Sequence, residues 1–372
     1  LLFTNNIHGA IHEVPARFIN PEFSPILAGG AGAFTYASKI RKEAKLKEDF
    51  VILTDAGNIF QGSQLGTYDG GSNIIKWMNW MAYDAIVPGV RDFDQGVNNL
   101  SKLASEANFP FLASNLEGVD GIEDYKIINA NGVKIGLIGL ITPFISEGLL
   151  PKYYEGVAVS DLMKTLNTQI EKIRSDVDLI FVLSHLGIPY DREDEYDDFI
   201  KDIERGVERP IRNAIELAHF TDEVDVIITG GVSKGYDTPW VDPTNHTIVL
   251  QNYGNLTGIG HLVLHIDNQN KVIENYSFPT ERGMMVNLFT DDIKEIEYIL
   301  LNQNIHFEII DVNIHKKNAA KNLSIYKIDG YEFPIELKIF DINDLKIQNK
   351  QILKTRGLSL KELEGFDPSD VA

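Results

Sequence analysis

The sequence predicts an α/β protein made of two parts, and three observations lead to that expectation. Short apolar runs recur along the chain, each followed by small or polar residues and then by a helical pattern. Between the runs, residues 73–80 and 161–173 carry apolar side chains at three- and four-residue spacing, which is typical of amphipathic helices packed on a sheet. The rhythm breaks at a Pro and a Gly within residues 278–283, so we expect a larger domain over residues 1–280 and a smaller one over 284–372.

Six apolar runs are the expected strands of the larger domain, in chain order residues 51–54, 85–87, 111–113, 133–140, 179–183 and 226–228. The loops at the ends of such strands carry the binding residues of α/β proteins, so a site is sought there. A further segment, residues 191–198, has six acidic residues out of eight. It lacks the Gly turn and the ligand spacing of an EF-hand, so we expect a solvated loop there rather than a cation site.

The composition excludes several classes of function. The chain of 372 residues has 34 Lys and Arg against 54 Asp and Glu, a formal charge of −20 that disfavours nucleic acids and anionic membrane surfaces as partners. It has no Cys, which excludes disulfides, thiolate catalysis and thiolate metal sites. No apolar run approaches the roughly 18 residues needed to cross a bilayer, so membrane insertion is not expected. Any chemistry must therefore use imidazole, carboxylate, amide or hydroxyl groups.

Polar motifs follow the expected strands in a set order. They are Asn6-Ile7-His8, Gly57-Asn58, Gly89-Val90-Arg91-Asp92, Ser184-His185 and Gly231-Val232-Ser233-Lys234. On these motifs, residues 1–277 resemble the calcineurin-like metallophosphoesterases and, within them, the 5'-nucleotidase branch. The resemblance implies a four-layer αββα sandwich holding two divalent metals about 3.5–4 Å apart, which would generate a hydroxide and clamp a phosphoryl group. It also implies a periplasmic or extracellular location, although the sequence itself is compatible with the cytoplasm.

Position by position, the motifs depart from the family pattern. The Asp-x-His motif has become Asn6-Ile7-His8, and the Gly-Asp motif, whose Asp bridges both metals in the family, has become Gly57-Asn58. A neutral amide cannot replace a bridging anion between two dications. Gly89-Val90-Arg91-Asp92 has an apolar side chain in place of an amide ligand and Arg91 in place of the phosphate-facing His, and Gly231-Val232-Ser233-Lys234 has lost both imidazoles and gained a cation. Among the family's ligand positions only His8 and His185 match. The degenerate pocket comprises Asn6, His8, Asn58, Val90, Arg91, His185, Val232 and Lys234.

We therefore expect no catalytic residue, no bound metal and no cofactor. The leading interpretation is a catalytically inactive protein, a pseudoenzyme, that acts as a structural or binding subunit of a larger assembly and has other protein subunits as partners. One alternative is a metal-dependent phosphoesterase or nucleotidase with an altered metal site. That site, which could hold a single metal, would be built from His8, His185 and Asp55 with either Asp92 or Asp94.

A second alternative is a metal-free module that binds a small anion such as phosphate. Its candidate residues are Arg91, Lys234, His8 and His185. The competing interpretation is that the two cations form internal salt bridges with neighbouring acids, which would be Asp55, Asp92 or Asp94. For the two histidines, the plainer interpretation is a hydrogen bond to backbone or to the amides of Asn6 and Asn58.

The smaller part is expected to begin with a βαβ unit, formed by a strand over residues 284–290, a helix over 293–301 and a strand over 307–312. This part resembles a glutaredoxin-type thioredoxin fold. Its Phe333-Pro334-Ile335 lies where the thioredoxin-like proteins have their cis-Pro. The helix begins with Asp291-Asp292 where Cys-x-x-Cys would be expected, so thiol–disulfide exchange is excluded. The alternative is a generic α/β capping domain. An aromatic nucleoside clamp cannot be found in this part, so nucleotide specificity has no support in the sequence.

Overall fold

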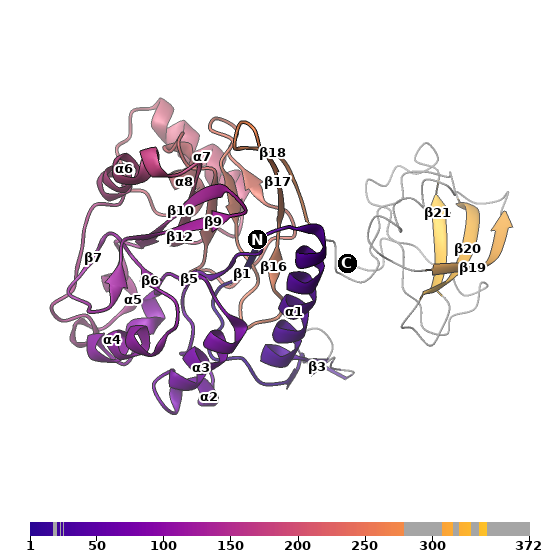
Figure 1. Cartoon of the computed structure of the whole chain (residues 1–372), viewed down its shortest axis with the longest axis horizontal. Helices are drawn as coiled ribbons and strands as arrows, with labels where there is room; N and C mark the ends of the chain where they lie inside the picture. Colours follow the sequence, from indigo (N-terminus) through magenta and orange to yellow (C-terminus); the bar gives the residue numbers. More distant parts are fainter. Residues whose placement is uncertain are drawn as a thin grey trace. The chain divides into compact units, whose positions relative to one another are not determined.

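Two six-stranded β-sheets form the centre of the N-terminal part of the chain in the computed structural model (Figure 1). The first sheet has the order β16-β1-β4-β5-β6-β8. Its strands are β1 (Leu2–Thr4), β4 (Leu53–Asp55), β5 (Ala85–Ile86), β6 (Phe111–Leu112), β8 (Ile122–Glu123) and β16 (Gly260–His261). All neighbours pair in parallel except β16, which runs antiparallel to β1. The carboxyl ends of β1 and β4 therefore lie side by side, with Thr4 opposite Asp55.

The second sheet has the order β14-β15-β13-β12-β10-β9. Its strands are β9 (Tyr125–Ala130), β10 (Val133–Ile141), β12 (Leu179–His185), β13 (Val226–Thr229), β14 (Trp240–Val241) and β15 (Ile248–Leu250). The central strands run parallel, and the two edge strands run antiparallel to their neighbours. Every residue of β12 is buried, as expected for a parallel strand that is covered on both faces.

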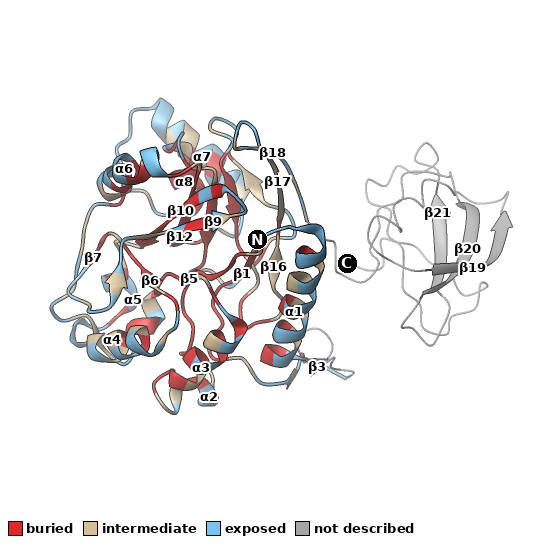
Figure 2. Ribbon diagram, in the orientation of Figure 1, coloured by how far each residue is buried: buried red, intermediate tan, exposed pale blue. Residues whose placement is uncertain are grey.

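Strand β12 shows how the layers are arranged. Leu179, Phe181 and Leu183 belong to the apolar cluster between the two sheets, whereas Ile180 and Val182 belong to a cluster shared with helices. This alternation follows from the pleat, which points successive side chains to opposite faces of a strand. A separate cluster joins the first sheet to its own helices. The N-terminal part is thus a four-layer αββα sandwich, with burial concentrated in the sheets and on the inner sides of the helices (Figure 2).

The helices of this sandwich are α1 (Gly29–Lys47), α2 (Gln64–Thr67), α3 (Ser72–Met81), α4 (Val97–Glu106), α5 (Ile145–Gly148), α6 (Leu162–Ile173), α7 (Arg192–Glu204) and α8 (Ala214–His219). Helix α3 buries Ile74, Ile75 and Met78 in the cluster with the first sheet. Helix α6 begins after Asp161, whose carboxylate accepts a hydrogen bond from the Lys164 backbone N–H at 2.8 Å, as an N-cap does. None of the described helices combines the length and the apolarity that crossing a bilayer requires.

Short elements complete the N-terminal part, and most of them connect the layers. They are the strands β2 (Val14–Pro15), β3 (Ile26–Leu27), β7 (Leu116–Glu117), β11 (Ala158–Val159), β17 (Val263–Asp267) and β18 (Val272–Ser277), and the 3₁₀-helices η1 (Val90–Phe93), η2 (Pro151–Tyr153) and η3 (Arg174–Asp176). Strands β17 and β18 form an antiparallel hairpin. The turn η1 matters for the site, because it carries the Gly89-Val90-Arg91-Asp92 motif.

The strands and helices predicted for the larger domain coincide with observed ones, but the acidic run does not form the expected loop. Residues 191–198 enter α7, which begins at Arg192. Two effects explain the difference. The acidic side chains of the first helical turn lie at the positive end of the helix dipole, where negative charge is favourable. In addition, Tyr196 and Phe199 bury one side of the helix against the second sheet's cluster.

The structure describes residues 1–17, 21–22, 24 and 26–278, and the backbone of residues 307–314, 320–328 and 335–340. By its internal contacts the chain divides into two units, Leu1–Phe278 and Pro279–Ala372. In the second unit, β19 (Phe307–Ile314), β20 (Ala320–Ile328) and β21 (Ile335–Phe340) form an antiparallel sheet in chain order. The predicted strand over 307–312 lies within β19. The predicted strand over 284–290, the helix over 293–301 and Pro334 lie outside the described residues, so the thioredoxin-like fold stays a prediction.

Candidate functional site

The carboxyl ends of parallel strands from both sheets bring the sequence motifs together. Asn6 follows β1, Asn58 follows β4, His185 ends β12 and Val232 follows β13. The first three side chains are almost completely buried, with exposed fractions of 1%, 6% and 3%. We call this group the strand-end site; its members are Asn6, His8, Asn58, Arg91, Asp92, His185 and Val232.

The two amides of the strand-end site are hydrogen-bonded to each other. Asn58 Nδ2 donates to Asn6 Oδ1 at 3.0 Å, and Asn58 Oδ1 accepts the backbone N–H of Arg91 at 2.8 Å. Asn6 Nδ2 donates to the carbonyl of Val232 at 2.7 Å, and Asn6 Oδ1 also accepts the N–H of Gly231 at 3.3 Å. In both amides the nitrogen donates and the oxygen accepts a hydrogen bond, and every partner belongs to the protein.

The two imidazoles are neutral and bonded to backbone. His185 Nδ1 lies 2.5 Å from the carbonyl of Ala56, and His8 Nδ1 lies 2.9 Å from the carbonyl of Gln61. A carbonyl can only accept, so each Nδ1 carries the proton and Nε2 keeps the lone pair. Burial lowers the pKa of His185 to about 4, and burial together with the charge of Arg91 lowers the pKa of His8.

The buried carboxylates of the region serve the backbone. Asp92 accepts the N–H groups of Asn58, Ile59 and Gly89 at 2.7–2.8 Å and so ties η1 to the loop after β4. Asp55 accepts the Thr4 hydroxyl at 2.6 Å and the Gly57 N–H at 2.7 Å. Burial is the main cause that raises the pKa of Asp55 to about 7 and that of Asp92 to about 6.

The cations of the two altered motifs point in different directions. Arg91 is half exposed, with Nη1 3.7 Å from Asp94 Oδ1 and 3.4 Å from the carbonyl of Gly148. The Lys234 ammonium donates to the carbonyl of Tyr190 and lies over the rings of Tyr190 and Tyr236, at 5.5 and 4.9 Å from their centroids. Arg91 and Lys234 are therefore engaged in separate contacts, and Lys234 helps to hold the loop after β13 against the loop after β12.

The apolar replacements also pack within the protein. Val90 contributes to the cluster between the first sheet and its helices. A Cβ placed on Gly187 would lie 2.7 Å from a methyl group of Val232, so Val232 fills the space beside that glycine. The ring of His185 is enclosed in the same way, because a Cβ on Gly57 or Gly89 would come within 2.8 or 2.6 Å of its atoms.

Known proteins resemble the chain in sequence and in fold. No protein-family model matches it. The 5'-nucleotidase of Rattus norvegicus is 26% identical over 296 residues, 75% of this chain and 48% of that protein. The snake venom 5'-nucleotidase of Crotalus adamanteus is 31% identical over 205 residues, 52% of this chain and 33% of that protein. The structure of the calcineurin-like phosphoesterase YfkN from Bacillus subtilis superimposes with a TM-score of 0.57 at 21% identity, covering 82% of this chain and 95% of that one.

The chain is thus similar in sequence to 5'-nucleotidases over part of their length, and it has the fold of the calcineurin-like phosphoesterases. The 5'-nucleotidase precursor of Thermus thermophilus has the same fold, with a TM-score of 0.57 at 20% identity over 74% of this chain and 52% of that one. The chain spans between a third and a half of the two curated relatives named above.

The calcineurin-like phosphoesterase family implies a pair of divalent metals, and the strand-end site does not fit them. Asn58 offers no charge at the bridging position, and its amide is occupied by Asn6 and Arg91. The carboxylates of Asp55 and Asp92 are turned to hydroxyl and backbone N–H donors. Within residues that the structure describes, no group of three or more His, Asp or Glu side chains is arranged to hold a metal ion. No step of a metal-dependent hydrolysis is therefore assigned to these residues.

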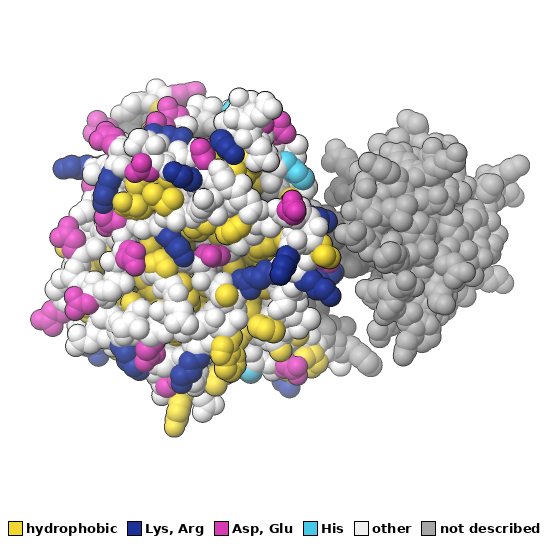
Figure 3. Space-filling model, viewed as in Figure 1, with side chains coloured by type: hydrophobic (Ala, Val, Ile, Leu, Met, Phe, Trp, Pro, Cys, Tyr) yellow, Lys and Arg dark blue, Asp and Glu magenta, His cyan; other side chains and the backbone are white. Residues whose placement is uncertain are grey.

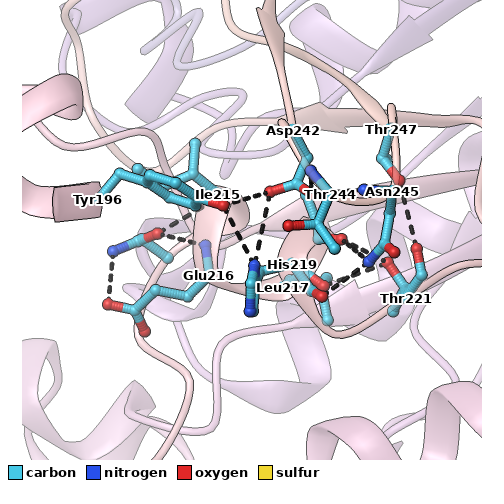
Figure 4. Close-up of polar contacts among 12 residues, drawn as sticks. Tyr196, Ile215, Glu216, Leu217, His219, Thr221, Asp242, Thr244, Asn245 and Thr247 are labelled. Carbon is cyan, nitrogen blue, oxygen red and sulfur yellow. Dashed lines mark hydrogen bonds and ion pairs between the residues drawn. The ribbon is translucent and has the colours of Figure 1, made fainter. Parts of the chain in front are cut away.

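A second polar network, which the sequence did not reveal, joins side chains of α7 and α8 to the turn at residues 242–247 (Figure 4). Asp242 is fully buried; it accepts the N–H groups of Thr244 and Asn245 at 2.9 and 2.8 Å and the Tyr196 hydroxyl at 3.1 Å. His219 Nδ1 lies 3.1 Å from the same hydroxyl. The network anchors both helices to the turn before β15. Its only signal in the sequence is the Asp-Pro turn at Asp242, since Tyr196 and His219 come from distant segments.

Proposed function

We propose that the chain is a non-hydrolytic member of the 5'-nucleotidase branch that acts as a binding or structural subunit of a larger protein assembly. The observation that carries the proposal is the position of Asn58, which hydrogen-bonds to Asn6 and to Arg91 where a phosphoesterase would need a bridging anion. The scaffold around this residue is nevertheless fully packed. A fold that keeps its core while its metal ligands are replaced is expected to serve through its surface.

Metal content and hydrolysis together test the inactive state. The protein is incubated with Mn²⁺ or Zn²⁺, passed through gel filtration and analysed for metal, then assayed with a nitrophenyl phosphate diester and with AMP. We expect less than stoichiometric metal and no turnover above the protein-free rate. Tight stoichiometric metal with turnover that disappears in His185→Ala, but persists in the exposed control His12→Ala, would contradict the proposal.

The subunit role needs its own experiment. Purification from the native source at native abundance should deliver the chain within an assembly of fixed composition. Elution as a free chain would count against a subunit. A location outside the cytoplasm belongs to the same proposal, and its support is that one relative with this fold is a precursor by name.

A further inference from the structure

The amides of the strand-end site join the two sheets of the sandwich. Asn6 extends from β1 of the first sheet, and its side chain donates to Val232 and accepts from Gly231 in the loop after β13 of the second sheet. Asn58, which follows β4 of the first sheet, donates to Asn6 and accepts a hydrogen bond from the Arg91 N–H. One continuous set of neutral hydrogen bonds therefore runs from the turn after β5 to the loop after β13.

Two neighbouring side chains make the same connection in parallel. His185, at the end of β12 in the second sheet, donates to Ala56, which follows β4 in the first. Asn5 donates to the Asn252 carbonyl at 2.9 Å and accepts the Asn252 N–H at 2.8 Å, which ties the end of β1 to the segment after β15. The sheets are thus linked where the family would place its metals.

Burial makes these bonds important. Asn5 and Asn6 are each 1% exposed, and Asn58 is 6% exposed. A buried donor or acceptor that loses its partner destabilises the fold, because water cannot replace the lost bond. The partners are uncharged, so the connection requires no cation.

We propose that Asn5, Asn6, Asn58 and His185 form a metal-free cross-link that gives this chain the cohesion a metal pair would otherwise supply between the two sheets. The inference goes beyond the proposed function, since a binding subunit could equally well have kept its metals. It predicts that folding of the N-terminal unit is indifferent to divalent cations and depends on the amides themselves.

The test compares thermal unfolding of the full chain in EDTA and in Mn²⁺ or Zn²⁺. The wild-type melting temperature should agree within about 1 °C in all three conditions. In EDTA, Asn58→Asp should lower it by about 3–10 °C, because an anion then faces Asn6 Oδ1 in a buried position. Asp suits this substitution, since Asn58 has φ 61° and Asp tolerates the left-handed conformation better than Ala does.

The matched control is Asn255→Asp, which makes the same change at an exposed residue with φ 56° and should leave the melting temperature within about 1 °C. In case Asn58→Asp does not fold, hydrogen exchange of the wild-type protein provides a second measurement. The backbone N–H groups of Arg91, Gly231 and Asn252 should be equally protected with and without EDTA, since their acceptors are side-chain amides.

Three results would overturn the inference. The first is a wild-type melting temperature that falls in EDTA or rises in Mn²⁺ or Zn²⁺, which would reveal a bound metal. The second is an Asn58→Asp variant as stable as the control. The third is fast exchange of the three N–H groups in EDTA.

Discussion

At the scale of single residues, one change of side chain alters the chemistry of the whole strand-end site. Asn58 is isosteric with Asp, but it can donate, and its Nδ2 donates to Asn6. A carboxylate there would place negative charge against an amide oxygen and would require cations nearby. The amide instead completes a neutral network, so the same backbone geometry serves a different chemical purpose.

Asp55 supplies a test of this environment by pH. Burial raises its pKa from 3.8 to about 7. The folded protein therefore holds a proton that the unfolded chain has released, and the free energy of unfolding should fall as pH rises between about 4 and 7. Asp55 alone should lower the free energy of unfolding by on the order of 4 kcal/mol over this pH range. Asp55→Asn imitates the protonated acid, so urea denaturation across this range should show a flatter profile than the wild type.

A matched variant keeps that prediction specific. Asp120→Asn makes the same change at an exposed position and should retain the wild-type slope. If Asp55→Asn and the wild type lose stability in parallel as pH rises, Asp55 is not the group responsible. In Asp55→Asn the amide oxygen can keep the Gly57 N–H, so the amide nitrogen donates to the Thr4 hydroxyl, which can then donate to the Tyr83 hydroxyl 2.8 Å away.

At the scale of secondary-structure elements, close approach between strands positions the site. Strand β10 of the second sheet crosses β6 of the first so closely that a Cβ on Gly139 would lie 2.2 Å from the backbone of Leu112. The Gly139 carbonyl also accepts the Ser114 N–H at 2.8 Å. Only glycine permits this contact, because any side chain would push the two sheets apart.

Gly139→Ala should therefore destabilise the N-terminal unit by about 1–3 kcal/mol or more, through overpacking between the sheets. Gly258→Ala is the control, since Gly258 is exposed and nothing lies within 4 Å of the added Cβ. Urea midpoints measure both variants. Equal midpoints for the two would show that the sheets separate without cost at Gly139.

At the scale of the whole molecule, charge sets the classes of partner. The formal charge is −20, although on the face seen in Figure 3 several Lys and Arg side chains gather near α1 while others lie among Asp and Glu. We expect the total charge to disfavour nucleic acids and anionic membrane surfaces as partners.

Two binding measurements check this expectation. The protein should not be retained by heparin or double-stranded DNA at about 0.15 M salt, and it should not sediment with vesicles rich in phosphatidylserine. Salt-dependent retention on either polyanion would contradict the expectation, because it would require a local basic surface strong enough to overcome the total charge.

The sequence by itself predicted the α/β class and the succession of the central strands and helices along the chain. Its resemblance to the 5'-nucleotidases implied that metal-ligand residue types are replaced at Asn6, Asn58, Val90 and Val232. These follow from local patterns and from residue identity, which the chain states directly. The tertiary structure decided what replaced the ligands. Lys234 turns to Tyr190, and Asn6 donates to Val232. Both contacts join residues distant in the sequence, and such partners meet only when the two sheets pack. The ion pair between Arg91 and Asp94 joins residues three apart, and the sequence had offered it as a local salt bridge.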